Sequence, residues 1–292
     1  MLKSHRHRDN LNIERLLGDY VRARLPGVLG ELVMFVFKQG WACLFGALLL
    51  AMIIASKLVW NPDWAFQRYD FLFLFAIATQ VLFLRFELET WEVARIIFLF
   101  HITRTAMEWF KVHAGSWGYP EPGLFKAMGV PLFSGFMYAA VGSYSARVIR
   151  IFSMRFAPYP PFWATMVLAV AIYVNFFAHH FLPDIRLVLF AATLLLFVRT
   201  RVWFINTTKA RWMPMPIAAV LAAFALWVAE NVGTATGTWL YSGQLPGQAV
   251  TFAKLGSWYL LLYVALVTVT VVSRSALSHD PGPPNFGPPT VR

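Results

Sequence analysis

Two glutamates, Glu108 and Glu230, stand in stretches of the chain that are otherwise strongly apolar. Each begins the same pattern, in which six residues separate the Glu from Gly-[Ser/Thr]-Trp-x-Tyr. The copies read EWFKVHAGSWGY and ENVGTATGTWLY, and the second follows the first by 122 positions. A carboxylic acid in an apolar site can hold a proton at neutral pH, and two such acids can divide the roles of general acid and general base. The pattern therefore predicts a paired acid site and an internal duplication.

Aromatic and polar residues near the two acids are the candidates for contact with a substrate, because aromatic faces stabilise a carbocation. The candidates are Trp117, Tyr119, Asn231, Trp239, Tyr241, Tyr138 and Ser134. The alternative is structural. Trp and Tyr gather at membrane interfaces, and the small residues around Ser134 are typical of close helix packing.

The residues that precede Glu108 form a polar stripe in an apolar helix. His101, Arg104, Thr105 and Glu108 have the spacing i, i+3, i+4, i+7, which places them on one face. Arg104 can pair with Glu108, whereas the residue four before Glu230 is Leu226, which offers no cation. The stripe predicts a buried acid–base or proton-relay site, and the alternative is an ion pair that fixes helix packing.

A third group, His179, His180 and Asp184, lies in the stretch NFFAHHFLPDIR. We count these residues with the two glutamates as candidates for catalysis, and His with Asp also raises the question of zinc. Adjacent histidines on a helix point about 100° apart, however, and the chain has neither H-E-x-x-H nor C-x-x-C. The sequence identifies no cofactor and leaves a metal open.

The composition determines what kind of element must carry these residues. The chain of 292 residues is 59% hydrophobic and 13% charged, with a mean hydropathy of +0.58. A soluble domain would have about 25% charged residues, so the composition indicates an all-α, polytopic membrane protein. The net charge of +11 fits basic cytoplasmic loops and anionic headgroups rather than nucleic acid. The single cysteine, Cys43, excludes an intramolecular disulfide.

Eight apolar stretches are long enough to be transmembrane helices. They lie near 32–56, 69–86, 92–112, 129–152, 162–182, 185–204, 214–236 and 251–273. The offset of 122 positions carries the first four onto the last four, which predicts two parallel four-helix repeats at 31–152 and 153–273. Residues 1–30 form an N-terminal segment with an amphipathic interfacial helix at 10–24, and 274–292 form a Pro/Gly-rich disordered tail.

The distribution of Lys and Arg predicts the orientation of these spans. With eight spans, seventeen basic residues would lie on the side of the termini and six on the opposite side. The positive-inside rule then places both termini in the cytoplasm. No signal peptide is expected, because no short apolar run with a cleavage site follows the basic N-terminus. Both glutamates would lie near the outer leaflet.

Several stretches carry a resemblance to a known family. EWFKVHAGSWGYPEPG, GVPLFSGFMYAAVGSY, NFFAHHFLPDIR, AENVGTATGTWLY and KLGSWYLLL resemble a bacterial family of multispan membrane proteins, domain of unknown function 817. The resemblance implies a location in the bacterial inner membrane. The Glu and Gly-x-Trp-x-Tyr pattern before Val130-Pro131-Leu132 is also similar to a motif of membrane lycopene cyclases and carotenoid hydratases. Those cyclases have Pro-x-Glu-Glu there, whereas Leu132, Phe133 and Ser134 follow Pro131 here.

Two functions fit the sequence. The first is acid–base chemistry of the cyclase or hydratase type on a hydrophobic isoprenoid or lipid, or binding of such a molecule. The alternative is a non-catalytic transporter, or a lipid- or pigment-binding subunit of a larger membrane complex. Both imply membrane lipids and a hydrophobic small molecule as partners, no nucleic acid, and an oligomeric state that the sequence leaves open.

Overall fold

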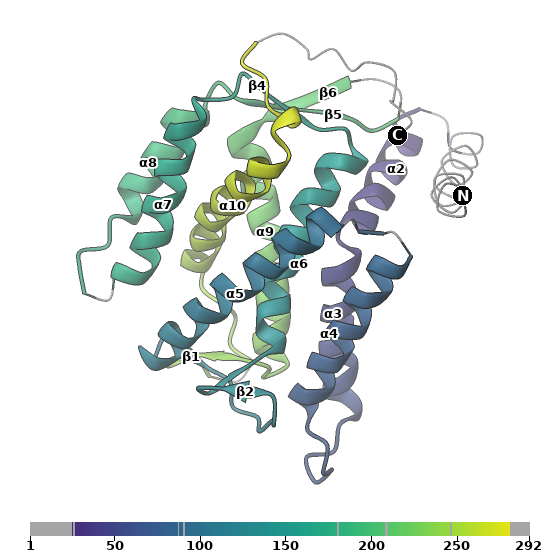
Figure 1. Cartoon of the computed structure of the whole chain (residues 1–292), viewed down its shortest axis with the longest axis vertical. Helices are drawn as coiled ribbons and strands as arrows, with labels where there is room; N and C mark the ends of the chain where they lie inside the picture. Colours follow the sequence, from purple (N-terminus) through teal and green to yellow (C-terminus); the bar gives the residue numbers. More distant parts are fainter. Residues whose placement is uncertain are drawn as a thin grey trace.

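The computed structural model describes residues 25, 27–86, 88–89, 91–179, 181–207, 210–245 and 247–280. Within this part the chain is mostly helical, and long helices run between two ends that carry short strands (Figure 1). The amphipathic helix predicted at 10–24, the candidate residue His180 and the final tail residues 281–292 lie outside the described residues.

Each of the eight predicted apolar stretches contains at least one helix. The helices are α2 (Gly27–Ala42), α3 (Leu44–Val59), α4 (Arg68–Arg85), α5 (Trp91–His113), α6 (Phe133–Ile151), α7 (Phe162–Ala178), α8 (Arg186–Phe197), α9 (Met215–Ala235) and α10 (Phe252–Val272). α2 and α3 share the first stretch and meet at Cys43 with a bend of 74°. The buried Arg147 of α6 donates a hydrogen bond of 2.6 Å to the carbonyl oxygen of Trp41, which satisfies a backbone acceptor beside the bend.

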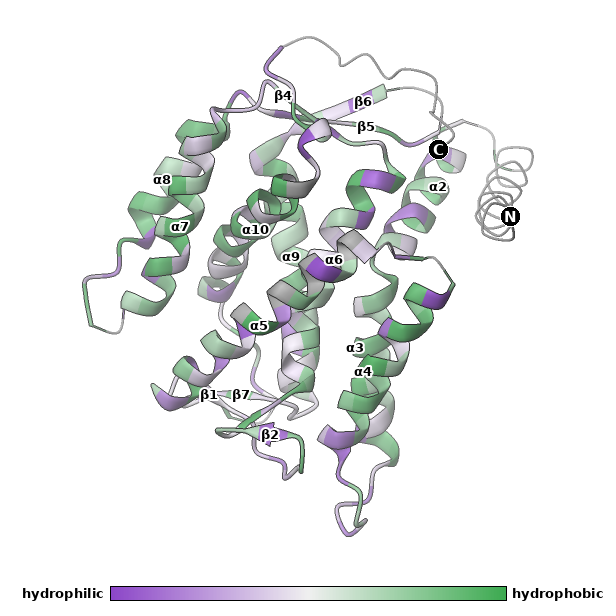
Figure 2. Ribbon diagram, viewed as in Figure 1, coloured by the Kyte–Doolittle hydropathy of each residue, from purple (hydrophilic) through white to green (hydrophobic). Residues whose placement is uncertain are grey.

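Helix length and apolarity do not support the prediction of eight membrane-crossing helices. Among the described residues, α9 and α10 are each long and apolar enough to cross a membrane, and the bent pair α2–α3 would make a third span. α7 and α8 have 17 and 12 residues, against about 20 for a hydrocarbon core. α4, α5 and α6 carry buried charges such as Asp70, Arg104 and Arg147. The apolar helices, visible in Figure 2, still indicate membrane association.

Short strands modify the all-α prediction. They are β1 (Trp117–Gly118), β2 (Lys126–Ala127), β3 (Val130–Pro131), β4 (Arg155–Ala157), β5 (Arg201–Ile205), β6 (Ala210–Pro214) and β7 (Leu240–Tyr241). They form the sheets β1-β7, β2-β3 and β4-β5-β6. The span predicted over 185–204 is the clearest correction, because α8 ends at Phe197 and β5 pairs with β4 and β6. The run RVWFI is rich in β-branched and aromatic residues, which favour a strand once neighbours supply hydrogen bonds.

Two main apolar cores hold the helices together. One joins the end of α6 with α7, α8, α9 and α10 around Phe197 and Tyr263. The other joins α3, α4, β3 and the beginning of α6, and it contains Trp117, Tyr119 and Trp239. Trp239 belongs to the second half of the chain but packs in the core of the first half. The two Trp-x-Tyr segments are therefore buried together.

The segment 274–280, which we predicted to be part of a disordered tail, is ordered. It contains the short 3₁₀ helix η1 (Arg274–Ala276) and is bonded to β4 through the backbone of Ser278 and Phe156. The amide of Ser278 donates to Phe156 over 3.0 Å, and the amide of Tyr159 donates to Ser278 over 2.7 Å. Backbone pairing thus extends the ordered chain to the edge of the sheet.

Candidate functional site

Each of the two glutamates is held by the Trp and Tyr of its own sequence copy. Glu108 accepts hydrogen bonds at Oε2 from Trp117 Nε1 and from the Tyr119 hydroxyl, both of 2.8 Å. Glu230 accepts hydrogen bonds at Oε1 from Trp239 Nε1 at 2.8 Å and from the Tyr241 hydroxyl at 2.6 Å. Both carboxyl groups are buried. The Trp and Tyr of the pattern are thus donors to its Glu.

The glycine of the pattern explains how the chain returns to its own Glu. Gly115 and Gly237 have φ angles of 69° and 64°, a left-handed conformation that favours glycine at the end of a helix. In both copies the next residue closes the helix end: Ser116 N donates to the Lys111 carbonyl over 2.9 Å, and Thr238 N to the Gly233 carbonyl over 3.0 Å. Each helix therefore stops and reverses, which aims Trp-x-Tyr back at the carboxyl group.

The two returning segments pair with each other. β1 and β7 are antiparallel, with Trp117 opposite Tyr241 and Gly118 opposite Leu240. The Trp117 and Tyr241 rings meet edge to face with centroids 5.9 Å apart. Glu108 interacts electrostatically with Glu230, so the two carboxyl groups belong to one site. Burial, followed by the charge of the carboxyl group that each one contacts, raises the pKa of Tyr119 and of Tyr241 well above its usual value. Both hydroxyls therefore remain protonated donors.

The two halves of this site differ in how fully the carboxyl group is satisfied. Glu230 accepts a third hydrogen bond, from Trp258 Nε1 of α10 to Oε2 at 3.1 Å. Lys254, also on α10, interacts electrostatically with Glu230, and its Nζ lies 3.7 Å from the centroid of the Tyr241 ring. Among the described residues Glu108 Oε1 has no hydrogen-bond partner. Both oxygens of Glu230 thus accept hydrogen bonds, whereas the bonds that Glu108 accepts from Trp117 and Tyr119 both end on Oε2, and Tyr138 lies near the same carboxyl group.

The expected Arg104–Glu108 ion pair is not formed within the described part of the chain. Arg104 is buried and donates to the sulfur of Met107, and its guanidinium lies 5.3 Å from the Tyr138 ring and 5.8 Å from the Tyr173 ring. The side chain is directed along the aromatic wall rather than toward the carboxylate. The expectation that Glu230 lacks a nearby cation is also corrected, because Lys254 reaches it from another helix, one that the spacing within α9 could not reveal.

A cavity of about 700 Å³ opens directly beside the paired motifs. Glu230, Tyr241, Trp239, Trp117 and Tyr119 line one end of it. Apolar side chains of α2, α3, α6 and α9 line the rest, up to the β5–β6 hairpin. The lining spans Ala218 to Glu230 on α9, which at 1.5 Å per residue is about 18 Å. An apolar cavity of this length suits an extended hydrophobic chain.

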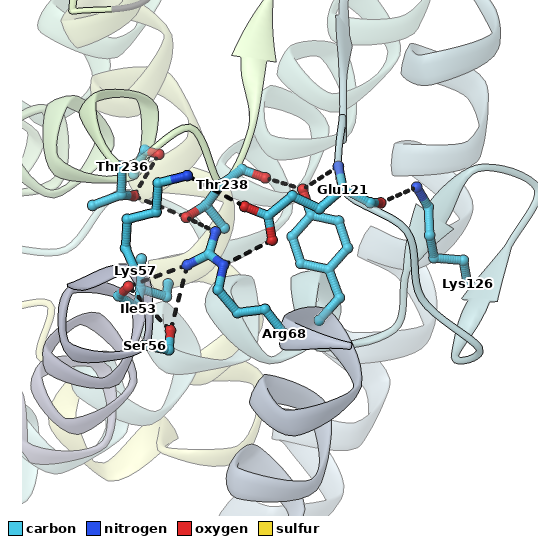
Figure 3. A network of polar contacts seen from close by, with 10 residues as sticks. Ile53, Ser56, Lys57, Arg68, Glu121, Lys126, Thr236 and Thr238 are labelled. Carbon is cyan, nitrogen blue, oxygen red and sulfur yellow. Dashed lines mark hydrogen bonds and ion pairs between the residues drawn. The ribbon is translucent and has the colours of Figure 1, made fainter. Parts of the chain in front are cut away.

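Arg68 connects four segments at the motif end of the molecule (Figure 3). Its guanidinium donates to Glu121 Oε2 at 2.7 Å and to Thr238 Oγ1 at 3.0 Å, which lie in the two motif loops. It also donates to the Ile53 carbonyl and to Ser56 at the end of α3. The arginine is only 3% exposed. The Trp and Tyr of each motif loop donate hydrogen bonds to one of the two acids. Because Arg68 joins the two loops, it also helps to fix the positions of the acids relative to each other.

Comparison with known proteins places the chain in a family. The family model described as protein of unknown function (DUF817) matches residues 31–266. The chain belongs to this family. A relative, the Uncharacterized protein YoaT of Bacillus subtilis (strain 168), is 39% identical over 246 residues, which are 84% of this chain and 92% of the relative. No solved structure matches the chain. The family resemblance that we inferred from the motifs is confirmed, and it brings no activity with it.

The residues of the two sequence copies converge, and of the other candidates Tyr138 and Ser134 lie near them, whereas Asn231 bonds elsewhere. Tyr138 lines the cavity and Ser134 is buried beside the Tyr119 hydroxyl. Asn231 instead bridges the Trp227 carbonyl and the Val250 amide, at 2.8 Å each, and so anchors the loop that precedes α10.

The histidine candidate lies in a separate cluster between α5, α7 and α8. His179 contacts Lys111, with 3.4 Å between Lys111 Nζ and His179 Nε2. Asp184 accepts a hydrogen bond of 3.1 Å from Asn175 and forms an ion pair of 2.8 Å with Arg186. Among the described residues no group of three His, Cys, Asp or Glu side chains could hold a metal ion.

Sequence reasoning missed three residues of the site, namely Arg68, Trp258 and Lys254. Arg68 was counted only as one of the few basic residues on the side opposite the termini, yet it is almost fully buried. Trp258 and Lys254 share one face of α10, four positions apart, and this spacing was the available signal.

Gly233→Ala should destabilise the protein strongly. A Cβ at this position would lie 1.8 Å from the Trp239 ring, so the ring must leave the position in which it donates to Glu230. We expect a loss of about 1–3 kcal/mol, typical of an overpacked core, measured by thermal unfolding in detergent. Gly46→Ala on α3 is the matched control, because its Cβ would meet Ala140 at 3.4 Å, an ordinary contact. Equal melting temperatures for the two variants would contradict this packing.

Proposed function

We propose that this protein binds a neutral, single-chain isoprenoid or lipid in the cavity and performs acid–base chemistry on it at the paired glutamates. The observation that carries the proposal is the cavity of about 700 Å³ that is apolar along most of its length and ends on Glu230. Ligand sites of this size are typically apolar with a few placed polar groups. The dimensions fit one extended chain, and the hydroxyls of the end wall fit a hydroxyl or carbonyl group.

The charge of the end wall supports a neutral ligand. Glu230 is 7% exposed and accepts three hydrogen bonds. An anionic headgroup would bring a second negative charge beside it in an apolar site, where like charges repel strongly. A neutral oxygen, or a carbocation formed during reaction, meets the aromatic faces of Trp117, Trp239 and Trp258 without that cost.

In the proposed chemistry the acids have different roles. Glu108 does not line the cavity, but Tyr119 does, and its hydroxyl donates to Glu108 over 2.8 Å. Glu108 would remove a proton from the ligand through Tyr119, whose hydroxyl would accept that proton and pass its own to Glu108 Oε2, and it would supply a proton by the reverse transfer. Glu230, with three donors and Lys254 nearby, would remain fixed and stabilise positive charge in the ligand. Such proton transfer typically contributes 10²–10⁴-fold to a rate.

The proposal includes the membrane topology expected from the sequence. The helices would form two parallel repeats in the membrane, with both termini cytoplasmic and the acids near the outer leaflet. The matching bonds of Glu108 and Glu230, and the β1–β7 pairing, support the repeat. Reporter fusions after residues 113 and 235 should both report the outer side. Opposite sides for the two positions would reject the parallel arrangement.

Blocking the cavity should abolish ligand binding. Ala222 lines the cavity on α9, and Ala222→Trp would fill part of it. We expect the purified protein to bind all-trans-retinol, a fluorescent neutral isoprenoid alcohol, with energy transfer from the tryptophans that line the cavity. Ala222→Trp should lose this signal. The control is Val228→Trp, which changes an exposed position of the same helix outside the cavity. Retinoic acid has the same apolar chain with an anionic head group. Stronger binding of retinoic acid than of retinol would contradict the proposal that the ligand is neutral.

A further inference from the structure

The cavity has a side opening between α2–α3 and α9, defined by Cys43, Ala47, Leu221 and Ala225. All four residues line the cavity. All four are also exposed at the surface of the protein. The lining residues of α6 and α10 are mostly less accessible, such as Ala140, Val141 and Leu262. The cavity therefore reaches the surface along one side, between two helices, as well as reaching the acids at one end.

The surface around the side opening is apolar. On α2 and α3 the flanking side chains include Val36 and Phe37, 61% and 64% exposed, and on α9 they include Val220 and Phe224, 46% and 49% exposed. α9 carries a single charged residue, Glu230, and α3 carries only Lys57 in its last turn. The middle of both helices is uncharged. Such a surface suits contact with lipid chains rather than water.

Two buried arginines fix the position of α2–α3, which forms one side of this opening. Small residues at i, i+4, i+7 and i+11, which are Ala218, Ala222, Ala225 and Ala229, form one face of α9, and such a face usually lets a neighbouring helix pack closely. Here they line open space instead. Arg147 holds the carbonyl oxygen of Trp41 beside the bend, and Arg68 holds the carbonyl oxygen of Ile53. α2–α3 is thereby fixed at two levels with a bend of 74° between its halves.

We infer that the ligand is taken up sideways from the hydrocarbon phase of the membrane through this side opening. This inference rests on the proposed function, and it specifies the substrate class as a membrane-dissolved, neutral, single-chain lipid. The head group would slide between the alanine face of α9 and α3 until it meets Tyr241 and Glu230. No step would then expose the apolar chain to water, which would cost about 0.8 kcal/mol per CH₂.

The test measures the rate at which retinol enters and leaves the protein. Wild-type protein in lipid vesicles is mixed with retinol-containing vesicles, and energy transfer is followed with time. Leu221→Trp enlarges an exposed side chain at the opening with little risk to folding. In a second arm the folded protein is alkylated at Cys43, the only cysteine of the chain, with a bulky maleimide. Cys43→Ala treated with the same reagent is the control for that arm, and Val228→Trp is the control for the first.

We expect both modifications to slow association by about tenfold and to slow release as well, because an obstructed route hinders passage of the ligand in both directions. Unchanged rates in both arms, with binding that Ala222→Trp still abolishes, would overturn the side opening and leave the proposed function standing. A weaker dissociation constant at an unchanged association rate would also overturn it. Absence of retinol binding to the wild type would overturn both.

Discussion

Glu108→Gln should abolish proton transfer while leaving the protein folded. Both present hydrogen bonds of Glu108 end on Oε2, and Oε1 has no partner among the described residues. A glutamine can place its carbonyl oxygen at the Oε2 position and its NH₂ group in the free position, so both bonds persist at a cost of roughly 1 kcal/mol or less. The amide cannot exchange a proton in the same way. Glu108→Gln therefore tests the effect on proton transfer separately from the effect on folding stability.

The measurement is deuterium incorporation into bound geranylgeraniol in heavy water, followed by mass spectrometry beside thermal unfolding. We expect a rate loss of about 10²–10⁴-fold, the usual contribution of a general acid or base. Incorporation at the wild-type rate in the folded Glu108→Gln protein would falsify the role of Glu108.

Glu230→Gln is the informative comparison, because it should act mainly on stability. Three donors point at this carboxyl group, from Trp239, Tyr241 and Trp258. A glutamine has only one oxygen, so its NH₂ group must face at least one of these N–H or O–H groups. A buried donor without an acceptor costs about 1–3 kcal/mol. Equal unfolding temperatures for Glu108→Gln and Glu230→Gln would contradict the difference in hydrogen bonding between the two carboxyl groups.

Arg68→Met should produce the largest loss of stability of any single substitution in the motif end. The change removes hydrogen bonds to Glu121, Thr238, Ser56 and the Ile53 carbonyl and leaves the Glu121 carboxylate without its closest cation. Removing one partner of a buried ion pair costs about 3–5 kcal/mol, and partial exposure of Glu121 places the expected value toward the lower end. Thermal unfolding in detergent measures it.

Two further substitutions show whether the arrangement of donors matters rather than the charge alone. Arg68→Lys keeps the charge but loses the planar fork, so it should recover less than half of the lost stability. Lys57→Ala removes a second cation that pairs with the Glu121 carboxylate; Lys57 Nζ lies 3.6 Å from Glu121 Oε1 and its side chain is 49% exposed, so stability should change by less than about 1 kcal/mol. A Lys57→Ala loss as large as that of Arg68→Met would contradict the assignment.

The sequence was informative wherever spacing along one helix or one turn determines the geometry. The pattern around Glu108 and Glu230 gave each acid a Trp and a Tyr at the same spacing, and in the structure these residues donate to their own acid, because a helix end and a glycine turn are local structures. The positions of the helices were also close, because apolar runs determine them. The family was recognised from the same motifs.

Contacts between distant segments could not be derived in this way. Arg68 and Lys254 reach the site from α4 and α10, and the spacing within α5 and α9, the helices that carry the two acids, does not reveal them. Arg104 was expected to pair with Glu108 four positions on, but the rings of Tyr138 and Tyr173 from α6 and α7 compete for its guanidinium. The strand β5 was assigned to a span, because an apolar run alone does not distinguish a strand from a helix end.

The pairing of β1 with β7 has a consequence for the order in which the protein matures. During synthesis the segment with Trp117 leaves the ribosome long before the segment with Tyr241. The β1–β7 pair beside Glu108 can therefore form only after the second segment has been made. The core around Tyr69 and Phe133 also remains open until Trp239 arrives to fill it. Contacts between such distant segments form late, because loop closure must precede them. The newly synthesised amino-terminal half therefore exposes part of its apolar core, and the site is completed only when the segment with Trp239 and Tyr241 has been synthesised.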